Sequence, residues 1–337
     1  MNRRTFLLYS GTMVVSLIIG CDAKDHGPGI HIFHATKRFA RRHAYLSVNI
    51  CGEMSPDVKQ ARFRLNKEVW RDLNQEGPRV PPPWFTIELT ESHLKKGRNH
   101  LEIETYTGGD SPHITSLWFI YDPSPVSLPI HEKWDDTDLD VQDGYWVVIE
   151  RGNKKRVRPK PGYEAYDRIL MVSGAFPGGR CIDTDVTFRN SIPNKLFGFG
   201  VLSLWGGHAD LMKRYPRKGW LYGIAWFYSR HNGIGVEFST HDGSHHNRIF
   251  SYRDFELKPN TRYFITVECR SEKDKNGQHL CYRQRMQWRT DDSQINSGDW
   301  IELADTEGSP LPESEYAVAL VAHRCIVDFG DVSITPL

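Results

Sequence analysis

The sequence lacks a surplus of either charge, because 43 basic side chains stand against 42 acidic ones and the formal net charge is +1. A chain this close to neutral has no global field that favours nucleic acid or an anionic membrane surface, so we expect no nucleic-acid partner. Helical periodicity is nearly absent as well, apart from a weak pattern over 208–213. Internal repeats and low-complexity tracts are also missing. The sequence therefore predicts an ordered, strand-rich chain.

Cysteine is scarce too. Beyond Cys21 the chain holds an odd number of them, so at least one thiol stays free or pairs elsewhere: Cys51, Cys181, Cys269, Cys281 and Cys325. Cys269 and Cys281 flank a polar segment with Asn-Gly at its tip, and one interpretation places them opposite each other across a hairpin. The other interpretation treats all five as small buried apolar residues.

The first 21 residues, MNRRTFLLYSGTMVVSLIIGC, combine a basic start, an apolar stretch from Thr12 to Ile19 and a small residue before Cys21. This layout is typical of a secretory signal, and the apolar stretch is shorter than the ~20 residues of a membrane-spanning anchor, the alternative interpretation. The segment resembles a bacterial lipoprotein signal, with IIGC in the lipobox position, and RRTFL resembles a twin-arginine export motif. The resemblance implies lipidation of Cys21, a membrane anchor through that lipid, and an extracytoplasmic place in the bacterial cell envelope.

After a tether over 22–39, the segment 40–122 reads as a series of short strands. AYLSVNI alternates Leu46, Val48 and Ile50 with polar residues, which predicts strands with one buried face and one wet face. Strands at this spacing favour a small antiparallel β-sandwich. The run ARFRLN, followed by PWFTIELTESHLKKGRNHLEI, resembles an immunoglobulin-like module.

A proline-rich linker over 123–133 precedes longer and more aromatic strands over 134–337. Their number and spacing fit a two-sheet jelly roll. This stretch, with its closing LVAHRCIVDFGDVSI, is similar to the concanavalin A-like lectin and glucanase superfamily. The expected fold is therefore all-β: a larger jelly-roll sandwich behind a smaller immunoglobulin-like one.

One strand pattern concentrates the residues suited to a ligand. In GWLYGIAWFYSRHNGIGVEF, alternation places Trp220, Tyr222, Trp226 and Tyr228 on one face. Rings of this kind cover the apolar face of a sugar while keeping a polar edge, although rings that simply fill the core are the competing interpretation. Polar neighbours and a further ring complete the candidate binding set: Trp205, His208, Arg230 and His231.

A second polar set lies in YRQRMQWR, where Arg283, Arg285, Gln287 and Arg289 share one strand face. Arginines side by side repel one another unless an anion lies nearby. That anion is either a protein carboxylate, with Asp183 and Asp185 as candidates, or a uronate or sulfate on a glycan. Arg283 is a candidate catalytic residue and Arg285 a candidate ligand-binding residue.

The E-x-D-x-E triplet of laminarinase-type members of the superfamily is missing, and the nearest carboxylates are DTD at 183–185 and the lone Glu237. This absence disfavours a laminarinase-type mechanism. Sandwich-fold lyases instead need a Tyr or His as base and acid, with polar groups that neutralise the uronate carboxylate. The candidate catalytic residues are therefore His208, Tyr222, Glu237 and Arg283.

Four aspartates gather in WDDTDLD, and Asp328 lies on the expected neighbouring strand. Asp136, Asp138 and Asp328 are candidate ligands of a structural Ca²⁺, against the alternative of a solvated loop. HDGSHH lacks metal-site spacing and reads as a polar hairpin loop.

The sequence predicts a monomeric, exported, lipid-anchored protein that binds or processes a polysaccharide on the concave face of its C-terminal sandwich. The alternatives are a polysaccharide lyase or non-laminarinase glycoside hydrolase, and a non-catalytic surface adhesion or structural protein.

Overall fold

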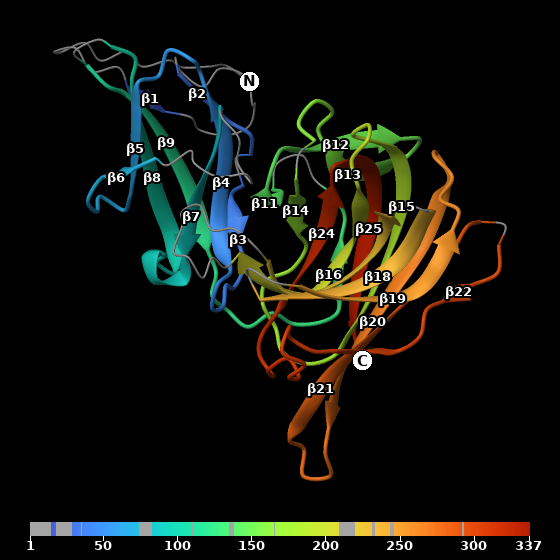
Figure 1. Ribbon diagram of the computed structural model, residues 1–337. Helices are drawn as coiled ribbons and strands as arrows, with labels where there is room; N and C mark the ends of the chain where they lie inside the picture. Colours follow the sequence, from blue (N-terminus) through green and yellow to red (C-terminus); the bar gives the residue numbers. More distant parts are fainter. Residues whose placement is uncertain are drawn as a thin grey trace.

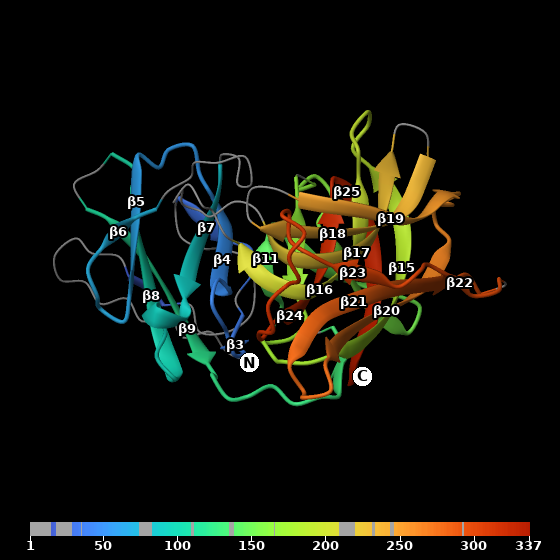
Figure 2. The ribbon, with the colours of Figure 1, turned by 60° about the horizontal axis from the view of Figure 1, so that its bottom comes forward.

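The chain folds almost entirely into β-strands (Figures 1 and 2). The computed structural model describes residues 15–17, 29–34, 36–73, 83–108, 111–134, 138–164, 166–208, 220–230, 233–242, 246–291 and 293–337. Within these ranges the helical content is the 3-10 turn η1 (Glu91–His93), and no helix is long and apolar enough to cross a membrane. Cys21 and the signal-like segment around it lie outside the described ranges, apart from the short strand β1 (Val15–Leu17).

The smaller N-terminal sandwich consists of two sheets. One sheet has the order β2 (Ile30–Ile32), β4 (Ser47–Met54), β7 (Trp84–Thr90). The other has the order β1, β9 (His113–Tyr121), β8 (Gly97–Tyr106), β5 (Gln60–Leu65), β6 (Arg71–Asp72), with β3 (Arg38–Phe39) also on β9. In β5 the residues Ala61, Phe63 and Leu65 are buried and their neighbours are not, as expected for strands that pack one face against a second sheet.

The larger C-terminal sandwich also has two sheets, which we call the nine-stranded and the seven-stranded sheet. The nine-stranded sheet has the order β12 (Trp146–Arg151), β13 (Lys154–Pro159), β25 (Cys325–Pro336), β15 (Arg180–Ser191), β20 (Arg262–Lys273), β21 (His279–Arg289), β22 (Asn296–Ser297). Two short strands complete it: β10 (Ile130–Glu132) pairs with β25, and β23 (Ile301–Leu303) pairs with β21. The seven-stranded sheet has the order β11 (Asp140–Asp143), β14 (Arg168–Met171), β24 (Ala317–His323), β16 (Gly198–His208), β17 (Trp220–Arg230), β18 (Gly233–Asp242), β19 (His246–Phe255).

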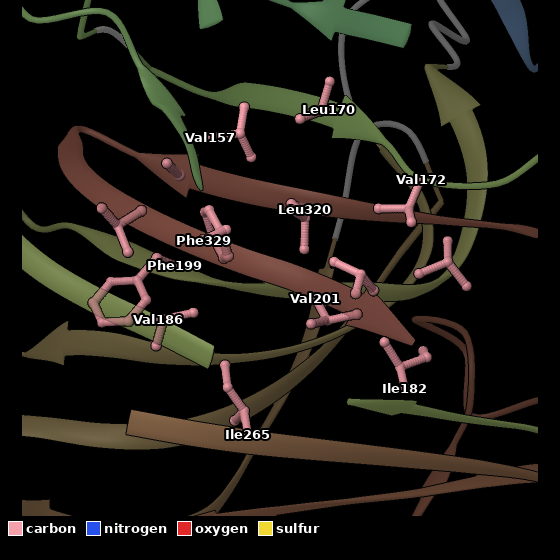
Figure 3. Packing of buried hydrophobic residues seen from close by; sticks show 14 of the residues in the cluster. Val157, Leu170, Val172, Ile182, Val186, Phe199, Val201, Ile265, Leu320 and Phe329 are labelled. Carbon is pink, nitrogen blue, oxygen red and sulfur yellow. The ribbon is translucent and has the colours of Figure 1, made fainter. Parts of the chain in front are cut away.

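The core of the larger sandwich lies between these two sheets (Figure 3). Val186, Ile265 and Phe329 of the nine-stranded sheet meet Phe199 and Leu320 of the seven-stranded sheet, and all five are fully buried. Burial of each such side chain stabilises the fold by roughly 1.5–3 kcal/mol. The predicted all-β class, with a larger two-sheet sandwich behind a smaller one, is confirmed.

The two sandwiches are joined directly, as Figure 1 shows for β4 and β11. Ser47 and Asn49 of β4 were expected on a wet strand face, but both are buried. This expectation was wrong because that face packs against the C-terminal sandwich, where the Asn49 side-chain amide donates to the Gln142 carbonyl oxygen at 2.6 Å.

An arginine from the N-terminal sandwich is buried at the same interface. Arg42 is fully buried and donates to both carboxylate oxygens of Asp140 at 2.8 and 2.6 Å. It also donates to the carbonyl oxygens of Ser47 at 3.0 Å and Ala40 at 2.9 Å. The interface is thus specified by polar contacts that neither sandwich satisfies alone.

Candidate functional site

Polar and aromatic side chains gather on the outer face of the seven-stranded sheet, the face turned away from the nine-stranded sheet. In β17, Ala225 and Phe227 enter the core between the sheets, so Ile224, Trp226 and Tyr228 point to the outer face. Register places Glu237 of β18 beside Trp226, and it places Tyr228 and His323 on either side of Gly198. We call the resulting group the Trp226 cluster: Tyr166, Asp167, Trp226, Tyr228, Glu237, Arg248, His323 and Arg324.

Two glycines of β16 make room for the rings of the cluster. A Cβ at Gly198 would lie 2.6 Å from Tyr228 Cδ2 and 2.9 Å from Trp226 Cε3, and one at Gly200 would lie 2.6 Å from Trp226 Cβ. Trp226 and Tyr228 therefore lie over the backbone of β16, stacked with ring centroids 4.6 Å apart. Any larger residue at Gly198 would displace these rings.

Glu237 holds the indole on one side. It is fully buried, and its Oε1 accepts a hydrogen bond from Trp226 Nε1 at 2.9 Å. Arg248 Nε lies 3.8 Å from the same oxygen, and the Arg248 guanidinium also lies 5.3 Å from the centre of the Tyr228 ring. Burial raises the pKa of Tyr228, so its phenol stays neutral at neutral pH.

His323 lies on the other side of the two rings. Its Nδ1 is 2.7 Å from Asp167 Oδ1, and both side chains are buried. Its ring centre is 6.1 Å from the ring centres of both Trp226 and Tyr228, and Tyr166 packs against it edge-on at 4.9 Å. A carboxylate at Asp167 accepts a hydrogen bond from a protonated Nδ1, while Nε2 is buried and has no hydrogen-bond partner within the described residues.

The open part of the cluster is its rim. Tyr166 is 52% exposed, and the Arg324 guanidinium lies 4.8 Å from the centre of its ring. Arg248 is also exposed. Burial raises the pKa of Tyr166, and the neighbouring Asp167 contributes. The rim therefore presents the Tyr166 ring and two guanidinium groups to solvent, while His323 and Glu237 are buried beneath it.

The rings predicted to form a ligand wall are mostly covered. Trp205 is fully buried, and Trp226 and Tyr228 are 3% and 6% exposed. His208 is buried too, and its ring packs edge-on against Trp205 at 5.0 Å. Trp205 therefore belongs to the same buried apolar cluster as Trp226 and Tyr228, which also includes Leu46 of the N-terminal sandwich.

Several predicted residues lie outside what the structure describes. Trp220, Tyr222 and Arg230 belong to β17, but their side chains are not among the described ones, and His231 and Asp136 lie wholly outside the described ranges. Their predicted roles stay predictions.

Arg283 and Arg285 lie on a different surface from Glu237. In β21 the buried residues Tyr282, Gln284 and Met286 alternate with them, so the two arginines point away from the core on the outer side of the nine-stranded sheet. The predicted alternation is thus confirmed, but the structure does not bring Arg283 together with His208 or Glu237.

Protein carboxylates accompany these arginines. Arg285 is paired with Glu268, and Arg283 Nη1 lies 3.7 Å from Glu272. Of the two anions considered from the sequence, the structure shows a protein carboxylate, although on β20 and not at Asp183 or Asp185.

Of the predicted calcium ligands, Asp138 and Asp328 are described, and each has other partners. Asp138 accepts hydrogen bonds from the backbone of Lys37 and Arg38, at 2.8 and 3.2 Å. Asp328 is fully buried, and its Oδ2 accepts from Arg189 at 2.8 and 2.6 Å. A cation at Asp328 would meet guanidinium groups, and the described residues contain no group of three or more metal-ligating side chains.

The predicted hairpin forms between β20 and β21, but the predicted facing of its two cysteines was wrong. The five cysteines in the described ranges form no disulfide, and the β20–β21 register pairs Cys269 with Gln284 and Cys281 with Glu272. Cys269 and Cys281 therefore do not face each other across the hairpin.

Sequence reasoning missed Tyr166, Asp167, Arg248, His323 and Arg324 as site residues. The dyad partners Asp167 and His323 are 156 residues apart, so no local motif joins them. The one available signal was the HR pair where an apolar strand ends, at His323 and Arg324.

A separate hollow of about 440 Å³ lies on the outer face of the nine-stranded sheet. Phe264 lines it together with several carboxylates, among them Asp183, Asp185 and Asp331. No residue of the Trp226 cluster lines this hollow.

No protein-family model and no curated protein matches the chain. Among solved structures, the carbohydrate-binding module CBM66 from Bacillus subtilis is similar at a TM-score of 0.34 and 14% identity, over 58% of this chain and 94% of that one. The VIP36 exoplasmic/lumenal domain, in a form bound to Ca²⁺ and Man3GlcNAc, is similar at a TM-score of 0.38 and 10% identity, over 59% and 83% of the two chains. The Emp47p carbohydrate recognition domain is similar at a TM-score of 0.33 and 10% identity, over 57% of this chain and 88% of that one. These TM-scores and identities are too low to give this chain a family, a ligand or a site.

Proposed function

We propose that the protein binds a polysaccharide on the outer face of the seven-stranded sheet, at the rim of the Trp226 cluster. The observation that carries the proposal is the half-exposed ring of Tyr166, packed edge-on against the buried His323 and flanked by Arg324. A flat ring beside hydrogen-bond donors suits a sugar, whose apolar C–H face stacks on the ring while its hydroxyl groups meet the donors.

The positive charges at the rim bear on which sugars can bind there. Arg248 and Arg324 are the cations beside Tyr228 and Tyr166. A guanidinium group donates to hydroxyl groups and, more strongly, to the carboxylate of a uronate. Both neutral and uronate-containing polysaccharides therefore belong in the test.

Catalysis is a second candidate function, favoured by the Asp167–His323 pair. A histidine that donates from Nδ1 to a carboxylate can use Nε2 as a base in an elimination on a uronate or in a hydrolysis; because Nε2 is buried here, the side chains that cover it must move before a substrate can reach it. Tyr228 is a further proton-carrying group beside His323, whereas Glu237 lies on the other side of Trp226. We infer that any turnover acts through His323, and His323→Asn is the variant that separates turnover from binding.

The place of action is part of the proposal. The resemblance of residues 1–21 to a lipoprotein signal supports export, lipidation at Cys21 and attachment to the bacterial cell envelope; the monomeric state is a separate part of the proposal. Globomycin treatment of the expressing bacterium tests this directly: accumulation of the unprocessed chain is expected, and normal processing would contradict it.

A glycan array with the full chain tests the binding proposal, and Tyr166→Ala is the informative variant. Loss of a stacking ring removes about 1.4 kcal/mol, a tenfold weaker affinity, with little change in thermal stability because the ring is half-exposed. Tyr45→Ala is the matched control, since Tyr45 is 50% exposed and lies outside the cluster. The proposal fails if no glycan binds, or if the two variants behave alike.

The catalytic alternative has its own readout. Uronate polymers incubated with the chain should yield the ultraviolet-absorbing unsaturated product of elimination, or new reducing ends from hydrolysis, and His323→Asn should abolish either. A chain that binds its glycan but forms neither product is a binding protein.

A further inference from the structure

Several arginines gather around β13 on the outer face of the nine-stranded sheet. Alternate residues of β13 bring Arg156 and Arg158 to this face, beside Asp328 and Gly330 of β25. The next strand, β15, contributes Asp185 and Arg189. We call this group the arginine patch: Arg151, Arg156, Arg158, Arg189, Arg262, Asp185 and Asp328.

Three guanidinium groups share the single carboxylate of Asp328. Arg189 binds Oδ2 through Nε and Nη2, Arg158 Nε lies 3.0 Å from Oδ1, and Arg151 Nε lies 3.8 Å from Oδ2. Asp185 is shared in the same way between Arg156 and Arg262. Asp328 thus leaves positive charge uncompensated at Arg151 and Arg158, whereas Arg262 also has Asp291 and Asp331 nearby.

The surplus charge is available to a ligand. Within the described residues, the terminal nitrogens of Arg158 form no hydrogen bond, and Arg151 makes no contact closer than its 3.8 Å approach to Asp328. The side chain of Arg151 is 52% exposed and that of Arg158 is 14% exposed. Burial lowers the pKa of Arg158, and although Asp328 opposes this effect, the neighbouring Arg151 and Arg189 lower the pKa further.

The hairpin between β12 and β13 extends the positive surface. The exposed Lys154 follows the glycine turn at Gly152 and lies opposite Arg151, on the same face as Arg156, whereas Lys155 lies on the other face, opposite Glu150. The aliphatic side chains beside the patch, Val147 and Ile149, are only partly exposed, and the exposed large apolar side chains of the described ranges lie elsewhere, so this surface presents no exposed ring or long aliphatic group to insert into a bilayer. An anion presented on a hydrophilic polymer is the better fit.

We propose that the arginine patch binds a sulfate or phosphate group of an anionic polysaccharide, seated between Arg151 and Arg158. Guanidinium forks match the oxygens of such a group, and the surplus of positive charge matches its negative charge. The patch lies on the opposite outer face from the Trp226 cluster, so this inference does not depend on the proposed function.

The test uses immobilised dextran sulfate, neutral dextran and vesicles containing phosphatidylglycerol, with the full chain in solution. Wild-type protein should bind dextran sulfate and not neutral dextran, and inorganic sulfate and rising salt should weaken the binding. Arg151→Ala with Arg158→Ala should weaken it at least tenfold and make its salt dependence shallower. Arg283→Ala is the matched control, because Arg283 is half-exposed on the same sheet and faces Glu272.

Three results would overturn the inference. They are unchanged binding in the double variant, an equal loss in Arg283→Ala, and binding to the anionic vesicles without binding to dextran sulfate. Melting curves check that the variants fold. If Arg158→Ala destabilises the chain, Arg151→Ala alone decides, since its half-exposed side chain has little part in packing. The double variant should bind the glycan selected by the array with unchanged affinity, which separates this inference from the glycan proposal.

Discussion

Arg42→Met should destabilise the protein strongly, because it removes one partner of a buried ion pair between the sandwiches. Arg42 is fully buried and the side chain of Asp140 is 16% exposed, so the variant leaves a carboxylate at the interface without its cation. Breaking such a pair from one side costs about 3–5 kcal/mol. The carbonyl oxygens of Ser47 and Ala40 also lose a donor.

Urea unfolding measures the effect. The account predicts a fall of about 3–5 kcal/mol in the free energy of unfolding for Arg42→Met, with much of it recovered when Asp140→Leu is added, since the double variant buries no unpaired charge. Arg38→Met is the control: Arg38 pairs with Asp122 at 3.6 Å on the surface and should cost at most about 1 kcal/mol. A loss below about 1 kcal/mol for Arg42→Met would refute the reasoning.

Three further predictions concern the ring cluster, pH and the thiols. Gly198→Ala should push Tyr228 off β16, which tryptophan fluorescence and weaker glycan binding would report; unchanged spectra and affinity would speak against this packing. Burial, with a contribution from a nearby histidine, lowers the pKa of His34 to about 3, so the stability it provides is present above the unfolded value of 6.5 and is lost as pH falls. Between pH 7 and 5 the titration of His34 should by itself remove about 2 kcal/mol of stability, so His34→Gln, which cannot titrate, should lose less than the wild-type chain over the same range; equal losses would contradict the assignment. A reductant should leave the melting temperature unchanged, and thiol titration of the unfolded chain without reductant should find all five of the described cysteines, whereas a lower count would reveal a disulfide.

The strands and their faces could be predicted from the sequence because period-two alternation is a local property. The alternation in β21 is an example, since Arg283 and Arg285 do lie on the face opposite Tyr282 and Gln284. The element that covers a strand face can come from a distant part of the chain, so a local pattern does not predict it. The polar residues Ser47 and Asn49 of β4 were expected to face solvent, but they are buried against the C-terminal sandwich.

The candidate site was only partly predictable for the same reason. Trp226, Tyr228 and Glu237 lie within one short segment of unusual composition, but the residues that cover them and pair with them come from elsewhere in the chain. His323 joins them through Gly198 of an intervening strand, and its partner Asp167 precedes β14. Strand order brings these residues together, and strand order is set by the packing of the whole sandwich.

A crystal structure with an oligosaccharide selected by the array tests the central claim most directly. The account predicts a sugar ring stacked on Tyr166, with hydroxyl or carboxylate groups on Arg248 and Arg324. A ligand bound elsewhere on the chain, with Tyr166 facing solvent, would contradict it.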